Sequence, residues 1–113
     1  MMLSSESFKA KYGIYPVSKV YSIAQIEYIV DLILRKYNIN RAYLYGDYAK
    51  NKAKENSAVG LDLLKGKNSP QLPALKLELT KALKKEVSLK DMLHDKDKDK
   101  MLIYRRHSRP LSY

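Results

Sequence analysis

The chain of 113 residues is 45% hydrophobic and 30% charged and contains no cysteine, which suits one globular domain and excludes disulfides and thiolate metal sites. Its net charge of +10 favours anionic partners, either nucleic acid or an acidic protein, although lysines interleaved with acids are also typical of a solvated surface. We expect a cytoplasmic protein without a membrane segment, because no apolar run approaches the roughly 20 residues that cross a bilayer.

Residues 1–21 are interpreted as an N-terminal arm. A short helix is predicted near Ser5 to Lys11, with Gly13 at its end, and Pro16 then favours extended backbone. The arm carries more large apolar side chains than a free terminus normally exposes, which are Phe8, Tyr12, Ile14, Tyr15, Val17 and Tyr21. We therefore expect it to pack across the boundary of a two-fold homodimer, with folding back on the first long helix, or disorder, as the alternatives.

A long helix is predicted to begin after Ser22. Ser22 and Gln25 have the spacing of a capping box. The apolar residues that follow share one helical face, and they are Ile23, Ile26, Ile29, Val30, Ile33, Leu34 and Tyr37. Asn38 and Asn40 suit the end of this helix, because asparagine tolerates left-handed backbone.

Two strands are predicted next. Residues 41–45 (RAYLY) alternate in hydrophobicity, and Gly46 ends that strand. A short helix is expected over residues 47–53, with Asp47 as its N-cap. Residues 58–64 are predicted as the second strand, in which Ala58, Gly60 and Asp62 share the face opposite Val59, Leu61 and Leu63.

The rest of the chain is predicted to contain a helix over residues 72–85 and a third short strand over residues 86–89. Four residues of the helix are expected to face inward, and they are Leu75, Leu79, Ala82 and Leu83. Another helix is expected to start at residues 91–93, and the run MLIY (residues 101–104) is apolar enough to dock on the core. Residues 106–113 are interpreted as a basic tail, and the cluster RRHSR (residues 105–109) at its start is a candidate phosphate contact.

This order of elements resembles the minimal nucleotidyltransferase family of the DNA polymerase β-like superfamily. The family pattern is G-S-x-A-R, then about seven residues, then S-D-x-D, and later a third Asp in a V-D-L strand. The chain matches it in residue type or position at Gly46, Tyr48, Ala49, Lys50, Ala53, Ser57, Val59 and Leu61. The resemblance implies an α+β domain over residues 22–105, with a small mixed three-stranded sheet flanked by helices.

The positions that carry the family's chemistry are replaced in this chain. By the resemblance, Asp47 stands for the motif serine, Ala58 and Gly60 for the two strand carboxylates, and Ser88 for the third acid. In the family those acids hold two Mg²⁺ ions that bridge the phosphates of ATP. Side chains without carboxylates are poor ligands for such a hard cation. The resemblance thus leaves a degenerate site, with a possible nucleotide-binding remnant of Gly46, Asp47, Lys50 and Ser57.

A rebuilt metal site from Asp47 and Asp62 is the alternative, and it would make Mg²⁺ and ATP cofactors after all. In the simpler interpretation Asp47 caps a helix and Asp62 pairs with a lysine. The acidic run at residues 95–100 lacks the glycine and the closing glutamate of a calcium-binding EF-hand loop. Neither His94 nor His107 has an evident second ligand or base.

The function expected from these residues is binding without catalysis. Members of the resembled family commonly act as antitoxins paired with a helical HEPN protein, which they adenylylate or cover. This chain is expected to keep only the covering function, as a pseudoenzyme antitoxin or a regulatory subunit. The alternatives are an active nucleotidyltransferase with a non-standard acid set and a basic nucleic-acid-binding protein.

Overall fold

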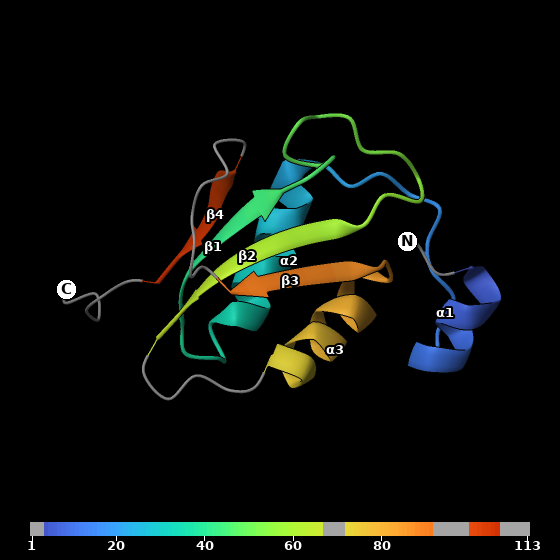
Figure 1. Cartoon of the computed structure of the whole chain (residues 1–113), viewed down its shortest axis with the longest axis horizontal. Coiled ribbons are helices and arrows are strands. Elements are labelled where there is room, and N and C mark those ends of the chain that lie inside the picture. Colours follow the sequence, from blue (N-terminus) through green and yellow to red (C-terminus); the bar gives the residue numbers. More distant parts are fainter. Residues whose placement is uncertain (1–3, 67–71, 92–99, 107–113) are drawn as a thin grey trace.

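A four-stranded mixed sheet is the centre of the fold. The structure, a computed structural model, describes residues 4–66, 72–91 and 100–106. Its elements in chain order are α1 (Ser5–Tyr12), α2 (Ile23–Leu34), β1 (Ile39–Tyr45), β2 (Val59–Lys65), α3 (Leu72–Leu83), β3 (Val87–Asp91) and β4 (Met101–Arg105). The strand order is β3-β2-β1-β4 (Figure 1). β1 is antiparallel to both of its neighbours, and β2 is parallel to β3.

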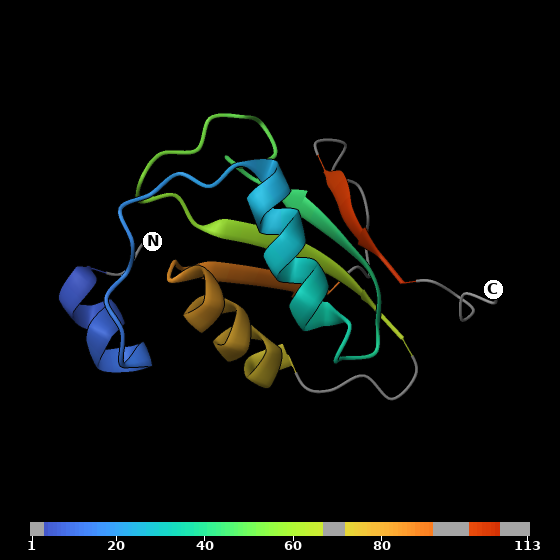
Figure 2. The same cartoon turned by 180° about the vertical axis from the view of Figure 1, so that it is seen from behind.

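Helices α2 and α3 lie side by side on one face of this sheet (Figure 2). The core forms between the two layers, and its fully buried members include Ile26, Val30, Leu34, Leu44, Leu61, Leu63, Leu75, Leu79 and Leu83. Because side chains alternate along a strand, the other face of the sheet receives Tyr43, Tyr45, Gly60, Asp62 and Ser88. Gly60 and Ser88, two of the positions that the resemblance assigns to catalytic acids, therefore lie on the face that the helices leave uncovered.

Local sequence signals set the start of α2 and the end of α1 as predicted. The capping box of α2 is present, since the Gln25 amide donates to Ser22 Oγ at 3.1 Å and the Ser22 amide donates to Gln25 Oε1 at 2.9 Å. α1 ends at Gly13, whose φ of 77° places it in the left-handed region that glycine adopts readily. The predicted helix near residues 5–11 and the helix after Ser22 are thus confirmed.

The sheet has one strand more than we predicted. Residues 101–105 were expected only to dock on the core, but they form β4 along the outer edge of β1. This pairing satisfies backbone groups of β1 that a three-stranded sheet would leave without partners. Ile103 and Tyr104 are buried there. Residues 92–99 and 107–113 lie outside the described residues, and they include both histidines, most of the tail and the charged run over residues 95–100 except for Lys100.

Two smaller expectations were wrong, and a third is tested only at its first residue. Asp91 ends β3, where it pairs with Leu63, while residues 92 and 93, on which the rest of the predicted helix start falls, lie outside the described residues. Ala82 is exposed, because the inward face of α3 passes through Leu83 and the neighbouring buried Thr80. α2 ends at Leu34 with Arg35 in the right-handed conformation, so its end involves no left-handed asparagine.

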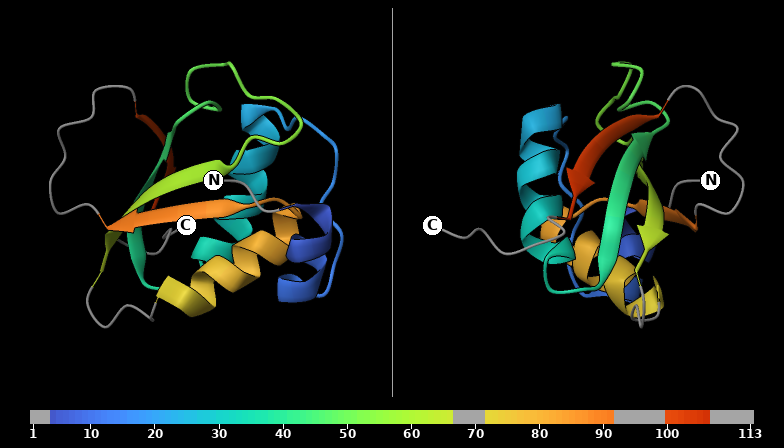
Figure 3. Two further views of the ribbon diagram at one scale, coloured as in Figure 1. Left: turned by 45° about the vertical axis from the view of Figure 1, so that its right-hand side comes forward. Right: turned by 90° about the vertical axis from the view of Figure 1, so that its left-hand side faces the viewer.

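The arm folds back on the chain and lies beside α3, whereas we had expected α2 as the alternative to a subunit boundary (Figure 3). Phe8 and Tyr12 are buried with their ring centroids 4.7 Å apart. The Val17 amide donates to Lys84 O at 2.9 Å, and the Tyr21 hydroxyl donates to Leu83 O at 2.6 Å. The homodimer stays a prediction.

In the described part of the chain, none of the helices is long and apolar enough to cross a membrane.

Candidate functional site

The four positions that the resemblance assigns to the family motif line one hollow, and they are Asp47, Ala58, Gly60 and Ser88. Residues 45, 60 and 88 are direct neighbours across β1, β2 and β3, because Tyr45 pairs with Gly60 and Gly60 pairs with Ser88. The turn after β1 and the chain before β2 close the hollow, which has a volume of about 420 Å³. Its lining consists of Tyr45, Gly46, Asp47, Lys54, Asn56, Ser57, Ala58, Gly60 and Ser88.

Tyr45 occupies the space beside Gly60 and Ser88, two of the positions at which the resemblance leads us to expect carboxylates. A Cβ placed on Gly60 would lie 2.7 Å from Cε2 of Tyr45, closer than real Cβ contacts allow. The Tyr45 hydroxyl lies 2.7 Å from Ser88 Oγ in a hydrogen bond. The Lys90 ammonium stands 4.2 Å from the centroid of the same ring. Tyr45 is thus held by both residue 88 and residue 90, and its ring fills the space beside Gly60.

The chain after β1 forms a turn, and the predicted short helix over residues 47–53 is absent from it. The Lys52 amide donates to Asp47 O at 2.8 Å, and Asn51 has a φ of 58°, which a helix does not accommodate. Tyr48 is 3% exposed and joins the core. Burial of this one tyrosine sets the course of the turn, so tertiary packing overrides the local helix signal here.

Contrary to our expectation, Asp47 therefore does not cap a helix. Its carboxylate accepts a hydrogen bond from Ser57 Oγ at 3.3 Å, and Ser57 Oγ in turn accepts one from the Lys54 amide at 2.8 Å. The remnant residues Gly46, Asp47 and Ser57 are thereby brought together, whereas Lys50 is exposed and does not line the hollow. Gly46 keeps a φ of 82°, at which a side chain would be strained.

Asp62 forms a buried salt bridge with a lysine, as the simpler interpretation had it. Lys100 Nζ lies 2.7 Å from Asp62 Oδ2, and the two side chains are 5% and 9% exposed. Lys100 Nζ also stands 5.7 Å from the Tyr43 ring centroid. The ammonium thus neutralises the charge of Asp62, whose other oxygen, Oδ1, is buried without a hydrogen-bond partner within the described residues. Within residues 4–66, 72–91 and 100–106, no group of three or more His, Asp and Glu side chains could hold a metal.

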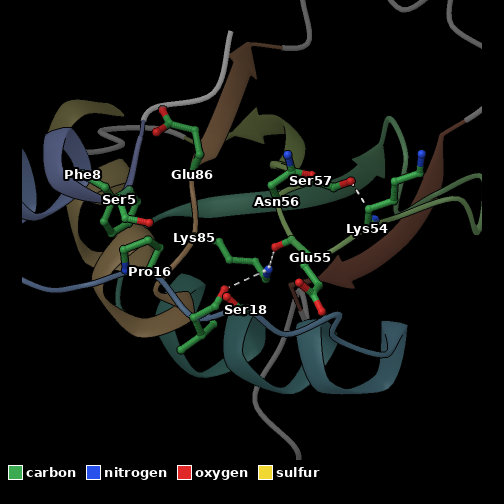
Figure 4. Close-up of a pocket in the computed structure, with 11 residues that line it drawn as sticks. Ser5, Phe8, Pro16, Ser18, Lys54, Glu55, Asn56, Ser57, Lys85 and Glu86 are labelled. Carbon is green, nitrogen blue, oxygen red and sulfur yellow. Dashed lines mark hydrogen bonds between the residues drawn. The ribbon is translucent and has the colours of Figure 1, made fainter.

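A second hollow of about 490 Å³ adjoins the first and shares Lys54, Asn56 and Ser57 with it (Figure 4). Lys85 lies in its wall, 3% exposed, and donates to Glu55 O at 2.5 Å and to Val17 O at 3.4 Å. Burial lowers the pKa of this ammonium, and the nearby Glu55 partly offsets the effect. Lys85 therefore fastens the arm and the loop before β2 to the end of α3.

Tyr45 and Lys85 are the site residues that the sequence analysis missed. A lysine among several others gives no sign that it will be buried. Gly60 did carry a signal, because glycine inside a strand often marks close approach by another group. Identifying that group requires the register of β1 against β2, which the sequence does not state.

Comparison with known proteins yields relatives among nucleotidyltransferases. No family model matches the chain. A Methanocaldococcus jannaschii protein named "putative protein adenylyltransferase" is 34% identical over 85 residues, which are 72% of this chain and 91% of that protein. A crystal structure of a toxin-antitoxin with AMP-PNP is 25% identical with a TM-score of 0.51, over 57% of this chain and 56% of that one. A nucleotidyltransferase structure from Sulfolobus solfataricus matches with a TM-score of 0.46 and 17% identity, over 78% of this chain and 91% of that one.

Proposed function

The chain belongs to the minimal nucleotidyltransferase family of the DNA polymerase β-like superfamily, and we propose that it acts there as a binding partner of another protein, without transferring nucleotides. The observation that carries this proposal is the row formed by Tyr45, Gly60 and Ser88. In that row a tyrosine takes up the space beside two positions at which the family has carboxylates.

The chemistry of nucleotidyl transfer explains why this row matters. The reaction depends on positioning the phosphates and on neutralising the charge that develops on them, which two Mg²⁺ ions normally accomplish. Among the residues that line the hollow, Asp47 alone carries a carboxylate, and it accepts a hydrogen bond from Ser57. One carboxylate does not fit a pair of Mg²⁺ ions, and a negative charge at this turn repels phosphate. We derive no catalytic step through metal at this site.

A protein partner is supported by the similarity to a toxin-antitoxin structure, although this chain spans 56% of that one. The family resemblance adds that such antitoxins pair with helical HEPN proteins. We propose an antitoxin-like or regulatory subunit that covers its partner and leaves it unmodified. The chain keeps the scaffold but lacks the acids of the family motif, which supports a subunit that covers its partner over one that modifies it.

Co-expression with the HEPN-type protein of the same genome tests both halves of the proposal. We expect one complex in size-exclusion chromatography, and an unchanged partner mass after incubation with ATP and Mg²⁺. A partner that gains the mass of an adenylyl group would establish an active enzyme with a non-standard acid set. In that case Asp47→Asn should abolish the modification. Failure to form any complex would contradict the binding half.

A further inference from the structure

Arginine is concentrated at one end of the molecule. Only five of the 22 basic residues are arginines, and four of these line two hollows that share Arg105 and Arg106. The four are Arg35, Arg41, Arg105 and Arg106, and the fifth, Arg109, lies outside the described residues. The residues that line the two hollows place them where β1 begins and β4 ends. The lysines, by contrast, are spread along the whole chain.

Two of these arginines face each other across neighbouring strands. Arg41 on β1 pairs directly with Arg105 on β4, and both are exposed. Like charges in this position destabilise a sheet. Arg35 has an acidic partner, Asp31, at 2.9 Å, whereas neither Arg41 nor Arg105 has one in the described part of the chain. A bound anion would remove the repulsion between them.

The third arginine is held at the same place by its neighbours. The Arg106 amide donates to Asn40 O at 2.9 Å, and its guanidinium donates to Asn38 Oδ1. Arg106 thereby lines the hollow of about 490 Å³ together with Asn40, Arg41, Leu64 and Arg105. The planar guanidinium offers two parallel donors that match the oxygens of a phosphate, which a lysine ammonium does not.

We propose that Arg41, Arg105 and Arg106 bind the phosphate backbone of a nucleic acid. The hollow lined by Arg41, Arg105 and Arg106 is polar apart from the half-buried Leu64. It therefore suits a hydrated phosphate chain better than it suits a partner protein, because the centre of a protein interface is normally apolar. Arg41 lies four residues before Tyr45 on β1, about 13 Å along the strand. The arginine site is therefore separate from the filled hollow and does not depend on the function proposed for it.

Fluorescence anisotropy with a labelled single-stranded RNA and a labelled DNA duplex, measured over a range of salt, tests this inference. The test variant is Arg41→Gln with Arg105→Gln. The control is Lys52→Gln with Lys81→Gln, which removes the same charge at two exposed positions outside both hollows. Thermal melts should show that the arginine variant is as stable as the parent or more so, because it loses a like-charge pair.

We expect the arginine variant to bind about 10- to 30-fold more weakly near 0.1 M salt. The logarithm of the association constant decreases with the logarithm of the salt concentration, and the steepness of this decrease should fall by about 1.4 for the RNA or about 1.8 for the duplex. The lysine control should keep the parent's slope. The proposal would be overturned if the arginine and lysine variants lost affinity equally, or if the parent did not bind nucleic acid. Equally tight binding of a labelled polyglutamate peptide would overturn it in favour of an acidic protein partner.

Discussion

The hydroxyl of Tyr45 and the hydroxyl of Ser88 are hydrogen-bonded at 2.7 Å, across a strand that carries Gly60 between them. The contact explains how the scaffold keeps its shape where the resembled family has three acids and their metal ions. A tyrosine from β1 bridges to β3 and covers the residue that has no side chain.

Gly60→Ala should destabilise the protein by about 1–3 kcal/mol, because the added methyl group overlaps the Tyr45 ring and forces it to move. Urea denaturation of Gly60→Ala, Tyr45→Ser and the double variant measures the coupling. In the variant that already carries Tyr45→Ser, Gly60→Ala should lower the free energy of unfolding by much less. Equal costs in both backgrounds would show that Tyr45 does not fill this space in solution.

Restoring the three acids with Ala58→Asp, Gly60→Asp and Ser88→Asp should lower the free energy of unfolding, because like charges gather in one hollow. Mg²⁺ should recover part of the loss by binding the folded state. The matched control carries Asn at the same three positions, which keeps the added volume without the charge. Its melting temperature should not respond to Mg²⁺. If the Asp variant equals the Asn variant with and without the ion, these positions do not converge.

Glu78 should contribute to stability in a pH-dependent manner. Hydrogen bonds from Lys36 and Tyr37 lower the pKa of its carboxyl below the ordinary 4.5. A carboxyl with a lowered folded-state pKa adds stability above its unfolded pKa and loses it as the pH falls through the folded value. The parent should exceed Glu78→Gln by at most about 1 kcal/mol at pH 7. Urea titrations should show that this difference vanishes below the folded-state pKa. A constant difference down to pH 2 would contradict the assignment.

Lys85→Met should loosen the arm, because the carbonyls of Val17 and Glu55 lose a shared donor. Limited proteolysis should then cut the arm before residue 18 faster than in the parent, while the rest of the domain stays resistant. Lys81→Met, at an exposed position of α3, is the control and should leave the cleavage rate unchanged. Equal cleavage of both variants would show that Lys85 does not hold the arm.

Features that depend on neighbouring residues in the sequence were predictable. Ser22 and Gln25 identified the start of α2, and Gly13 identified the end of α1. The family resemblance grouped Asp47, Ala58, Gly60 and Ser88 as one site, and the structure places all four at one hollow.

Features that depend on distant pairing were missed. β4 is stabilised by β1, which lies more than 50 residues earlier in the chain, so residues 101–105 carried no local signal of their own beyond an apolar run. The turn after Gly46 follows from the burial of Tyr48 in the core. The position of Tyr45 over Gly60 and Ser88 likewise depends on the register of three strands.

Isothermal titration calorimetry with Mg²⁺ and ATP tests the central claim most directly, because it asks whether the hollow at Tyr45, Gly60 and Ser88 still takes a metal-bound nucleotide. The account predicts that the parent chain shows no saturable binding in the micromolar range. Clear one-site or two-site binding in that range, abolished by Asp47→Asn, would contradict it.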